Sequence, residues 1–454
     1  MIRSDKTALN IAVDRLREEN GEVALVACHL LDRFIRDSSP DHLEPLKDVI
    51  RSGIQDAEDH IRRYKARKAR RKRLIAPRIK RKGALGRQLK GHLGVIEQRT
   101  ALYRERTSIL RQVGDAVVWH LLQYDIRRVA PLYKPGPHQL PSGIGLAGVI
   151  QLQRTLHASG QFLAMETDLT RCAGLGDLLV VRRDGRQLAP LNLEVKTKNP
   201  TELREDVEVE MAILTAGSGH PLDQEALRML TDLTGKDLED ELVISERGER
   251  QAAEIASRTS IIAEALTSGA KSLRAPDRNW TALKRVVDRA LQSGCSLDIA
   301  EKGVYYFAFE VRESSSNEAA LRSLRRDVRK FAAGELGAAL SIQLHDRGDL
   351  SGLVPPIPLW KLPLSIRARI LSGQIVVGTF VEQDVLQQLL RSAGLDMTEQ
   401  GGIWTVRDES GQEVSLGPLH AQAARLGIVV GALSPRSIAD GIIEAFRTST
   451  PAEH

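Results

Sequence analysis

Hydrophobic positions in the first 140 residues recur at steps of three and four, the spacing of one helical face. The first such face is formed by Leu9, Val13, Leu16, Val26, Leu30 and Phe34. Residues 38–41, Ser-Ser-Pro-Asp, then carry the composition of a helix start. We therefore expect one helix before this break and a second after it, running to near Pro77.

A third long helix is expected after the glycines at positions 83, 86, 91 and 94. Apolar residues recur there at every seventh position, but Arg99, Arg106 and His120 make the second seam polar. A coiled coil needs two apolar seams. The pattern therefore favours a helix packed in a bundle.

The pattern changes after a proline-rich linker at residues 131–141. A helix is expected at 144–156, and strand character follows at 162–169, 177–182 and 191–198. Helical periodicity returns from Thr201 to about Leu291, and 304–311 reads as a strand. Further on, 403–406 and 413–416 flank a turn and predict a hairpin, and Ser434-Pro435 predicts the start of a final helix.

The predicted fold class is α/β, with three regions along the chain. They are a helical region with a basic arm (1–140, the arm at 62–90), a central core with a helical insertion at about 215–300 (141–333), and a C-terminal α/β region of unknown role (334–454). The length of 454 residues also suggests two or three domains.

Charge is concentrated in the basic arm, which holds 15 Lys and Arg residues and no acid. Since the whole chain has a net charge of +6, the remaining residues carry a net −9. So dense a run of like charge favours a polyanionic partner. We expect nucleic acid, contacted through Arg67, Lys68, Arg70, Arg71 and Lys72. A solvated helix end is the alternative.

An acidic segment has the opposite bias, with 14 acids and 4 bases between Glu202 and Glu249. It is typical of a solvated helical face, or of a segment that docks on the basic arm and masks it.

Composition and motifs exclude several classes of protein. The 42% hydrophobic content is that of a globular chain, and the three cysteines lie too far apart for a zinc ribbon or a disulfide framework. No HExxH, GxxxxGK[ST] or GxSxG motif occurs. Without a secretory signal or an apolar run of membrane length, we expect a cytoplasmic protein that does not enter a membrane.

Candidate chemistry lies between residues 174 and 198. Asp177 precedes an apolar strand, and the alternation of the next strand places Glu194 and Lys196 on one face. If the two strands pair, Asp177 can reach the same point. Two carboxylates and an ammonium group suit phosphodiester hydrolysis, because a hard divalent cation prefers carboxylate oxygens and polarises a phosphate. An ordinary surface hairpin is the alternative.

Gly176-Asp177 followed by Glu194-Val195-Lys196 resembles the signature of the PD-(D/E)XK nuclease superfamily. The resemblance implies a restriction-endonuclease-like core, α-β-β-β-α-β, whose last strand would be 304–311. It implies that Asp177, Glu194 and the Val195 carbonyl bind Mg²⁺ or Mn²⁺, and that Lys196 serves the attacking water.

Many members of that superfamily carry a third acid on the preceding helix. Residues 143–160 contain no acid, so Glu166 is the substitute that we consider.

The resulting expectation is a metal-dependent nuclease, with DNA favoured over RNA, of a kind found in defence, mobile-element or repair systems. The first alternative is a non-catalytic nucleic-acid-binding or scaffolding protein with a degenerate nuclease fold. The second is a structural subunit whose basic arm docks an acidic protein. We also expect the N-terminal helices to be able to join a partner protein or a second copy of the chain.

Overall fold

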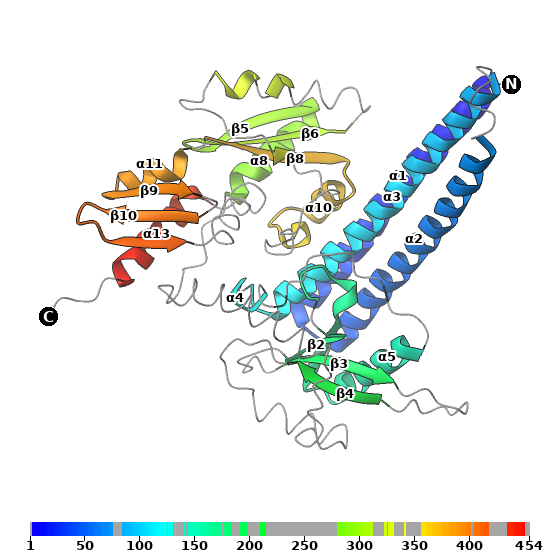
Figure 1. Cartoon of the computed structure of the whole chain (residues 1–454), viewed down its shortest axis with the longest axis horizontal. Helices are drawn as coiled ribbons and strands as arrows, with labels where there is room; N and C mark the ends of the chain where they lie inside the picture. The colour runs from blue at the N-terminus through cyan, green and yellow to red at the C-terminus, as the bar shows by residue number, and fades with distance from the viewer. Residues whose placement is uncertain are drawn as a thin grey trace.

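The structure is a computed structural model, and it describes most of the chain with gaps. The described residues are 2–75, 84–124, 126–129, 132, 140, 144–174, 176–183, 191–197, 209–214, 279–311, 322–324, 326–330, 340–341, 356–382, 384–400, 403–416 and 434–449. They form a mixed helix and sheet fold, as the sequence predicts, with three antiparallel sheets. Three long helices extend from the body of the molecule, with one sheet beside their lower end (Figure 1).

The long helices are α1 (Ile2–Asp37), α2 (Pro40–Ile75) and α3 (Ala84–Leu121). The break at 38–41 is confirmed, because the Leu43 N–H donates to the Ser39 carbonyl and Pro40 opens α2. The helix α3 begins earlier than predicted, since Gly91 and Gly94 lie within it. Nothing lies within 4 Å of a Cβ at either glycine, so both face open space.

A polar position that breaks the predicted heptads has a specific partner in the bundle. The Arg106 guanidinium binds the Asn20 side chain from α1 at 2.9 Å and Asp56 from α2 at 3.3 Å. Arg106 is only 8% exposed, so its charge replaces an apolar contact at the centre of three helices. This explains why the second seam is polar.

The first sheet follows α4 (Ile126–Val129) and α5 (Ile144–Ala158) along the chain. Its strand order is β1-β2-β3-β4, with bounds β1 Phe162–Glu166, β2 Leu178–Arg182, β3 Leu191–Thr197 and β4 Val209–Leu214. The predicted helix and the three predicted strands are thereby confirmed, except that β1 ends at Glu166. A 3-10 turn, η2 (Thr167–Leu169), replaces the end of that strand.

Residues 209–214 contradict the predicted helix from Thr201 to Leu291. They form β4, which pairs antiparallel with β3 along its length. The segment Val207-Glu208-Val209-Glu210 alternates with a period of two, and this strand signal was outweighed by the helical pattern around it. Residues 201–208 and 215–278, which include most of the expected insertion, lie outside the described residues.

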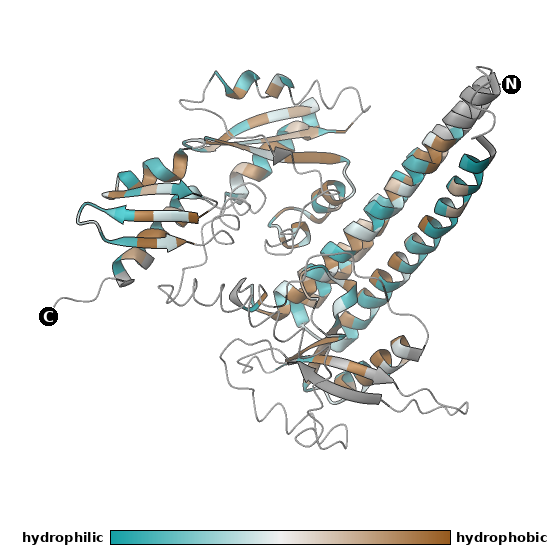
Figure 2. Cartoon of the chain, in the orientation of Figure 1, coloured by the Kyte–Doolittle hydropathy of each residue, from teal (hydrophilic) through white to brown (hydrophobic). Residues whose placement is uncertain are grey.

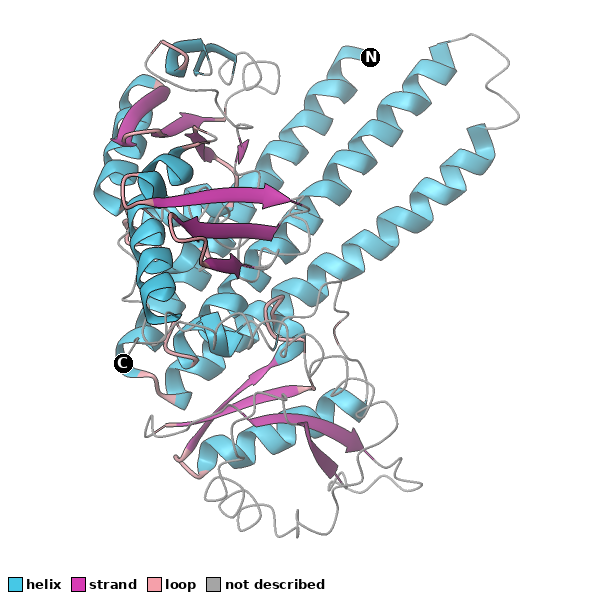
Figure 3. Ribbon diagram, turned by 60° about the vertical axis from the view of Figure 1, so that its left-hand side comes forward, coloured by secondary structure: helices cyan, strands magenta, loops and turns pink. Residues whose placement is uncertain are grey.

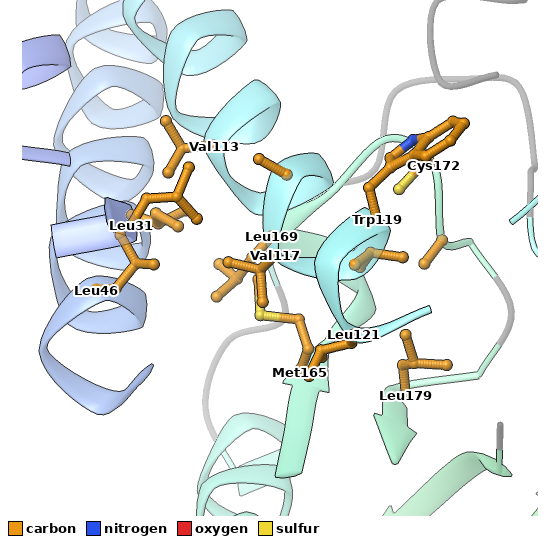
Figure 4. Packing of buried hydrophobic residues seen from close by; sticks show 14 of the residues in the cluster. Leu31, Leu46, Val113, Val117, Trp119, Leu121, Met165, Leu169, Cys172 and Leu179 are labelled. Atoms are coloured by element: carbon orange, nitrogen blue, oxygen red, sulfur yellow. The ribbon is translucent and has the colours of Figure 1, made fainter. Parts of the chain in front are cut away.

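The first sheet is covered on both faces. Leu163, Met165 and Leu179 join one buried cluster with Leu46 of α2 and Val117 of α3 (Figure 4). The helix α5 contacts β1 and β3, and lies along the sheet in Figure 3. One face of the sheet therefore packs against the bundle, and α5 packs against the other face.

The second sheet has the order β5-β6-β8-β7. Its strands are β5 Cys295–Glu301, β6 Val304–Glu310, β7 Leu340–Ser341 and β8 Ile375–Val381. Strand β6 is the predicted strand 304–311, but it pairs with β5 and β8 and not with the first sheet. The expectation that it completes a nuclease core is therefore wrong.

The second sheet also contradicts the expected helical insertion and the expected boundary between the second and third regions of the chain. The strand β5 lies within the expected helical insertion, so that insertion is not helical throughout. The pairing of β6 with β8 also crosses the boundary that we expected at residues 333 and 334. The helices of this region are α8 (Trp280–Ser293) and α10 (Leu364–Leu371), with a 3-10 turn η4 (Ile357–Leu359).

The third sheet has the order β11-β10-β9 and confirms the predicted C-terminal hairpin. Its strands are β9 Leu395–Gln400, β10 Ile403–Asp408 and β11 Glu413–Leu416. The helices α11 (Val385–Arg391) and α13 (Pro435–Ser449) share a buried cluster with it. The predicted start of the last helix is confirmed, because the Ile438 N–H donates to the Ser434 carbonyl.

None of the described helices combines the length and the apolarity needed to cross a membrane.

Candidate functional site

The loop between β1 and β2 is held in place by α3. The Asp115 carboxylate accepts hydrogen bonds from the N–H groups of Arg171 and Cys172, at 2.5 and 2.8 Å. One residue earlier, a Cβ on Gly114 would lie 2.2 Å from the Leu169 carbonyl oxygen. A glycine and an aspartate on one turn of α3 therefore fix the loop that carries the candidate site.

Gly176 and Asp177 form a sharp entry into β2. Gly176 has a φ of +67°, and a Cβ there would lie 2.7 Å from the Leu193 carbonyl oxygen. The Asp177 N–H donates to that same oxygen at 2.7 Å, while Leu178 is the residue that pairs with Leu193. Asp177 and Leu178 of the β2 segment thus both lie opposite Leu193 of β3, as in a β-bulge. A β-bulge changes the direction in which a side chain of the bulged strand points.

The bulge directs Asp177 to the predicted motif on β3. The Val195 N–H donates to the Asp177 carboxylate at 2.7 Å. In an extended strand the N–H and C=O of one residue point to the same neighbour. The Val195 carbonyl therefore also faces the end of β2, as the nuclease resemblance requires.

Glu194 and Lys196 flank Val195 in β3, opposite Ala212 and Glu210 of β4. Their side chains lie outside the described part of the structure. By alternation both positions share a face with Asn192, which pairs with Leu179 of the bundle-facing cluster. The backbone thus brings Asp177 to the Glu194-Val195-Lys196 segment, on the sheet face turned toward the bundle.

A second acid, Asp168 in the turn η2, was not among the residues predicted from the sequence. Burial, and then the neighbouring charge of Asp177, raise the pKa of Asp168 to about 6. The turn is bonded to the entry of β2, since the Thr167 hydroxyl donates to the Gly176 carbonyl at 2.6 Å. The predicted strand continued to Leu169, and in a continued strand Asp168 would lie beyond the point where β1 pairs with the start of β2. The turn η2 instead brings Asp168 back toward that point.

The bundle supplies charged groups to the same place. An Arg111 nitrogen on α3 lies 3.7 Å from a Glu58 carboxylate oxygen on α2, and the Arg111 side chain is only 8% exposed. Both residues affect the pKa of Asp168. The positive charge of Arg111 lowers this pKa, and the negative charge of Glu58 raises it. No local pattern could have joined residues more than 50 positions apart.

Glu166 is engaged elsewhere. It is buried at the end of β1, and its carboxylate accepts hydrogen bonds from two nitrogens of Arg51 on α2. Lys47 Nζ lies 4.0 Å away. The residue considered as the third carboxylate therefore belongs to an ion pair that joins the sheet to α2, and Asp168 is the acid beside Asp177.

The described donors suit a hard divalent cation but do not complete a site. In the part of the chain that the structure describes, no group of three His, Cys, Asp or Glu residues lies close enough to hold a metal ion. Asp168 and Asp177 provide two neighbouring carboxylates, and Glu194 is the next acid on the facing strand. Carboxylate and carbonyl oxygens are the ligands that Mg²⁺ and Mn²⁺ prefer.

The described portion of the basic arm lies at the far end of α2, where most of the ribbon in Figure 2 has the colour of hydrophilic residues. Arg67, Arg70 and Lys72 are exposed, with the Arg67 guanidinium 5.8 Å from the centre of the Tyr64 ring. Arg71 is half-buried. Lys68 pairs with Glu97 of α3 at 2.7 Å, so one predicted phosphate contact is an ion pair within the bundle.

Parts of two charge predictions lie outside the described residues. They are residues 76–83 of the basic arm and the acidic segment 202–249 apart from β4. Masking of the arm by that segment stays a prediction.

No protein-family model matches the chain, and neither a curated protein nor a solved structure matches it.

Proposed function

We propose that this protein is a metal-dependent nuclease that hydrolyses phosphodiester bonds, with DNA as the favoured substrate over RNA. The observation that carries the proposal is the 2.7 Å hydrogen bond from the Val195 N–H to the Asp177 carboxylate. It joins the two halves of the predicted motif, which lie 18 residues apart in sequence, at one end of one sheet. This is the arrangement that a restriction-endonuclease-like site needs.

Each motif residue has a role in this proposal. Asp177, Glu194 and the Val195 carbonyl hold Mg²⁺ or Mn²⁺. The cation supplies charge neutralisation at the phosphate and lowers the pKa of a coordinated water. Lys196, on the same face of β3 as Glu194, orients the attacking water and stabilises negative charge on the phosphate.

The surroundings of the site support a polyanionic substrate. The cations of α2 face solvent beyond the sheet, and acidic neighbours for them are few among the described residues. Contacts of Lys and Arg with phosphates release counterions, which provides affinity without sequence preference. The same helix carries Glu58 next to the candidate site, so binding and cleavage would share one element.

The test is cleavage of plasmid DNA, linear duplex DNA and single-stranded RNA with Mg²⁺ or Mn²⁺. Asp177→Asn and Glu194→Gln are expected to abolish cleavage, and Lys196→Ala to slow it by ~10²-fold or more. Asp288→Asn is the matched control, because Asp288 is a surface carboxylate of α8 paired with Lys284. Full activity of Asp177→Asn on a nucleic acid that the wild type cuts would contradict the proposal.

A non-catalytic nucleic-acid-binding protein with a degenerate nuclease fold is the second candidate. It is favoured by the pairing of β6 with β8 in the second sheet, because β6 was expected to be the last strand of the nuclease core. This candidate predicts tight binding of DNA, no cleavage with either metal, and identical binding by the wild type and Asp177→Asn.

A further inference from the structure

The cations of α2 lie on two different sides of the helix, and one side is aligned with the candidate site. Residues three, four and seven apart share a helical face. Lys65 and Lys72 follow Glu58 by seven and fourteen residues, and Arg62 follows it by four. All three cations are exposed, and Arg62 also pairs with Asp59 on the same helix.

Contacts nearer the start of α2 show which way this face points. Arg51, seven residues before Glu58, binds Glu166 of the first sheet. Glu58 itself lies beside Arg111 and influences Asp168. The face that carries Arg51, Glu58 and Lys65 is therefore the sheet side of α2, and Arg62 adjoins it. Lys72 continues this face at the far end of α2, where Lys68 and then Lys72 lower the pKa of Glu97 on α3.

A second set of cations provides the internal comparison. Arg63 and Arg70 follow Asp56 by seven and fourteen residues, and Asp56 points to Arg106 in the bundle. Arg67 follows His60, whose ring stacks on Tyr103 of α3 with a centroid distance of 4.4 Å. These three exposed cations thus lie on the side of α2 away from the sheet.

We propose that Arg62, Lys65 and Lys72 form a phosphate track that holds a nucleic-acid backbone and leads it to Asp168 and Asp177. The inference rests on the proposed function, and it adds which cations guide the strand that is cut. At 1.5 Å per residue, Lys65 and Lys72 lie about 10 and 21 Å along α2 from Glu58. With 3.4 Å of duplex axis per phosphate of one strand, that length matches about six base pairs.

Nucleic acid fits this surface better than an acidic protein. An acidic protein surface would be attracted by any of the exposed cations of α2. Asp168 and Asp177 repel either partner, but a divalent cation bound there would attract a phosphate, and only a nucleic-acid backbone presents phosphates. A backbone that enters a site for phosphodiester cleavage does benefit, because the track sets its register.

The experiment compares two triple variants that remove the same charge. One is Arg62→Gln, Lys65→Gln and Lys72→Gln, and the other is Arg63→Gln, Arg67→Gln and Arg70→Gln. Binding of duplex DNA and of RNA of the same sequence is measured against salt in the Asp177→Asn background. The sheet-side variant is expected to flatten the log–log salt slope by about 2 to 3 units, since each phosphate contact contributes about 0.9.

Cleavage in the otherwise wild-type protein separates guidance from affinity. The sheet-side variant is expected to cleave at least tenfold more slowly even at saturating DNA, because the bound strand loses its register. Raising the DNA concentration is expected to restore most of the cleavage lost by the other variant. Equal slowing of the two variants at saturation, or an unchanged salt slope for the sheet-side variant, would overturn the track.

A cross-linking measurement keeps the track testable if the protein cuts nothing. Cys295 is the exposed cysteine, so a Cys295→Ser, Asp177→Asn protein can carry a photoreactive label on Lys65→Cys or on Arg67→Cys. Position 65 is expected to cross-link DNA several-fold more efficiently than position 67. That result without any wild-type cleavage would support the track and refute the nuclease proposal, whereas stronger cross-linking from position 67 would refute the track.

Discussion

Gly176 shows how one backbone position can shape the candidate site. Its φ of +67° lies in the left-handed region that glycine adopts at little cost. In addition, a Cβ would meet the Leu193 carbonyl, the group that accepts the Asp177 N–H. The close approach of β2 and β3 therefore requires glycine at position 176.

Gly160 provides a control for this requirement. It has a φ of +68°, but nothing lies within 4 Å of a Cβ built there. Gly160→Ala is expected to lower the free energy of unfolding by about 1 kcal/mol, from backbone strain alone. Gly176→Ala should cost about 2–4 kcal/mol, because the strands must also separate. Equal losses in denaturant unfolding would show that the approach to Leu193 is unimportant.

Asp168 is a residue whose charge opposes folding. Its pKa is raised from 3.8 to about 6 by burial and by Asp177, so the ionised form is disfavoured in the fold. That penalty is fully present above pH 6 and disappears below pH 3.8. Asp168→Asn should therefore stabilise the metal-free protein at pH 7.5, by about 1–2 kcal/mol, and have little effect near pH 4. Thermal unfolding at the two pH values measures this, and a lower Tm at pH 7.5 would contradict it.

At the scale of elements, buried charges attach α5 and β1 to α2. The His157 Nδ1 lies 2.5 Å from a Glu44 carboxylate oxygen, and the His157 Nε2 accepts the Ala164 N–H. Burial alone would raise the pKa of Glu44, but His157 and Lys47 lower it to about 2. This contribution to stability is present above the ordinary pKa of 4.5 and is lost as the pH falls through 2.

Lys47 is the cation on which this attachment depends. Its side chain is fully buried and lies 2.9 Å from Glu44 and 4.0 Å from Glu166. Lys47→Ala should cost about 3–5 kcal/mol, because Glu44 and the buried Glu166 lose a cation that His157 and Arg51 only partly replace. Lys284→Ala, which breaks an exposed pair on α8, should cost less than about 0.5 kcal/mol. If both variants lose a similar free energy of unfolding, the buried network stabilises the fold no more than an exposed ion pair does.

At the scale of the whole molecule, the bundle is the body to which two sheets attach. The first sheet shares a buried cluster with α1, α2 and α3. The second sheet shares another cluster with Ala24 and Cys28 of α1 and Ile109 of α3. An ion pair also joins α10, which packs with the second sheet, to α1. The two terminal nitrogens of Arg367 bind the two carboxylate oxygens of Asp32, at 3.0 and 2.6 Å.

Arg367 tests whether the second sheet is fixed to the bundle by that pair. Arg367→Lys is expected to destabilise α10 almost as much as Arg367→Ala, because an ammonium group cannot bind both oxygens in one plane. Hydrogen exchange should accelerate in α10, while exchange in β2 and β3 stays unchanged. Slow exchange in α10 of both variants would show that the apolar cluster alone holds the two parts together.

The local features of this protein could be predicted from the order of its residues alone. Helical and strand periodicity located the three long helices, the strands β1 to β3 and the C-terminal hairpin, because each pattern depends on neighbours within a few residues. The same locality placed the cations on α2 and placed Asp177 and Val195 at the facing ends of adjacent strands.

The contacts between residues far apart in the chain could not be predicted in this way. Periodicity identified β6 but carried no information on its partner, so its pairing with β8 depended on contacts about 70 residues apart. The pairing of Glu166 with Arg51 and the approach of Arg111 to Glu58 likewise join separate elements. Such meetings depend on how whole elements pack around shared apolar clusters, and this packing is a property of the complete fold rather than of any segment.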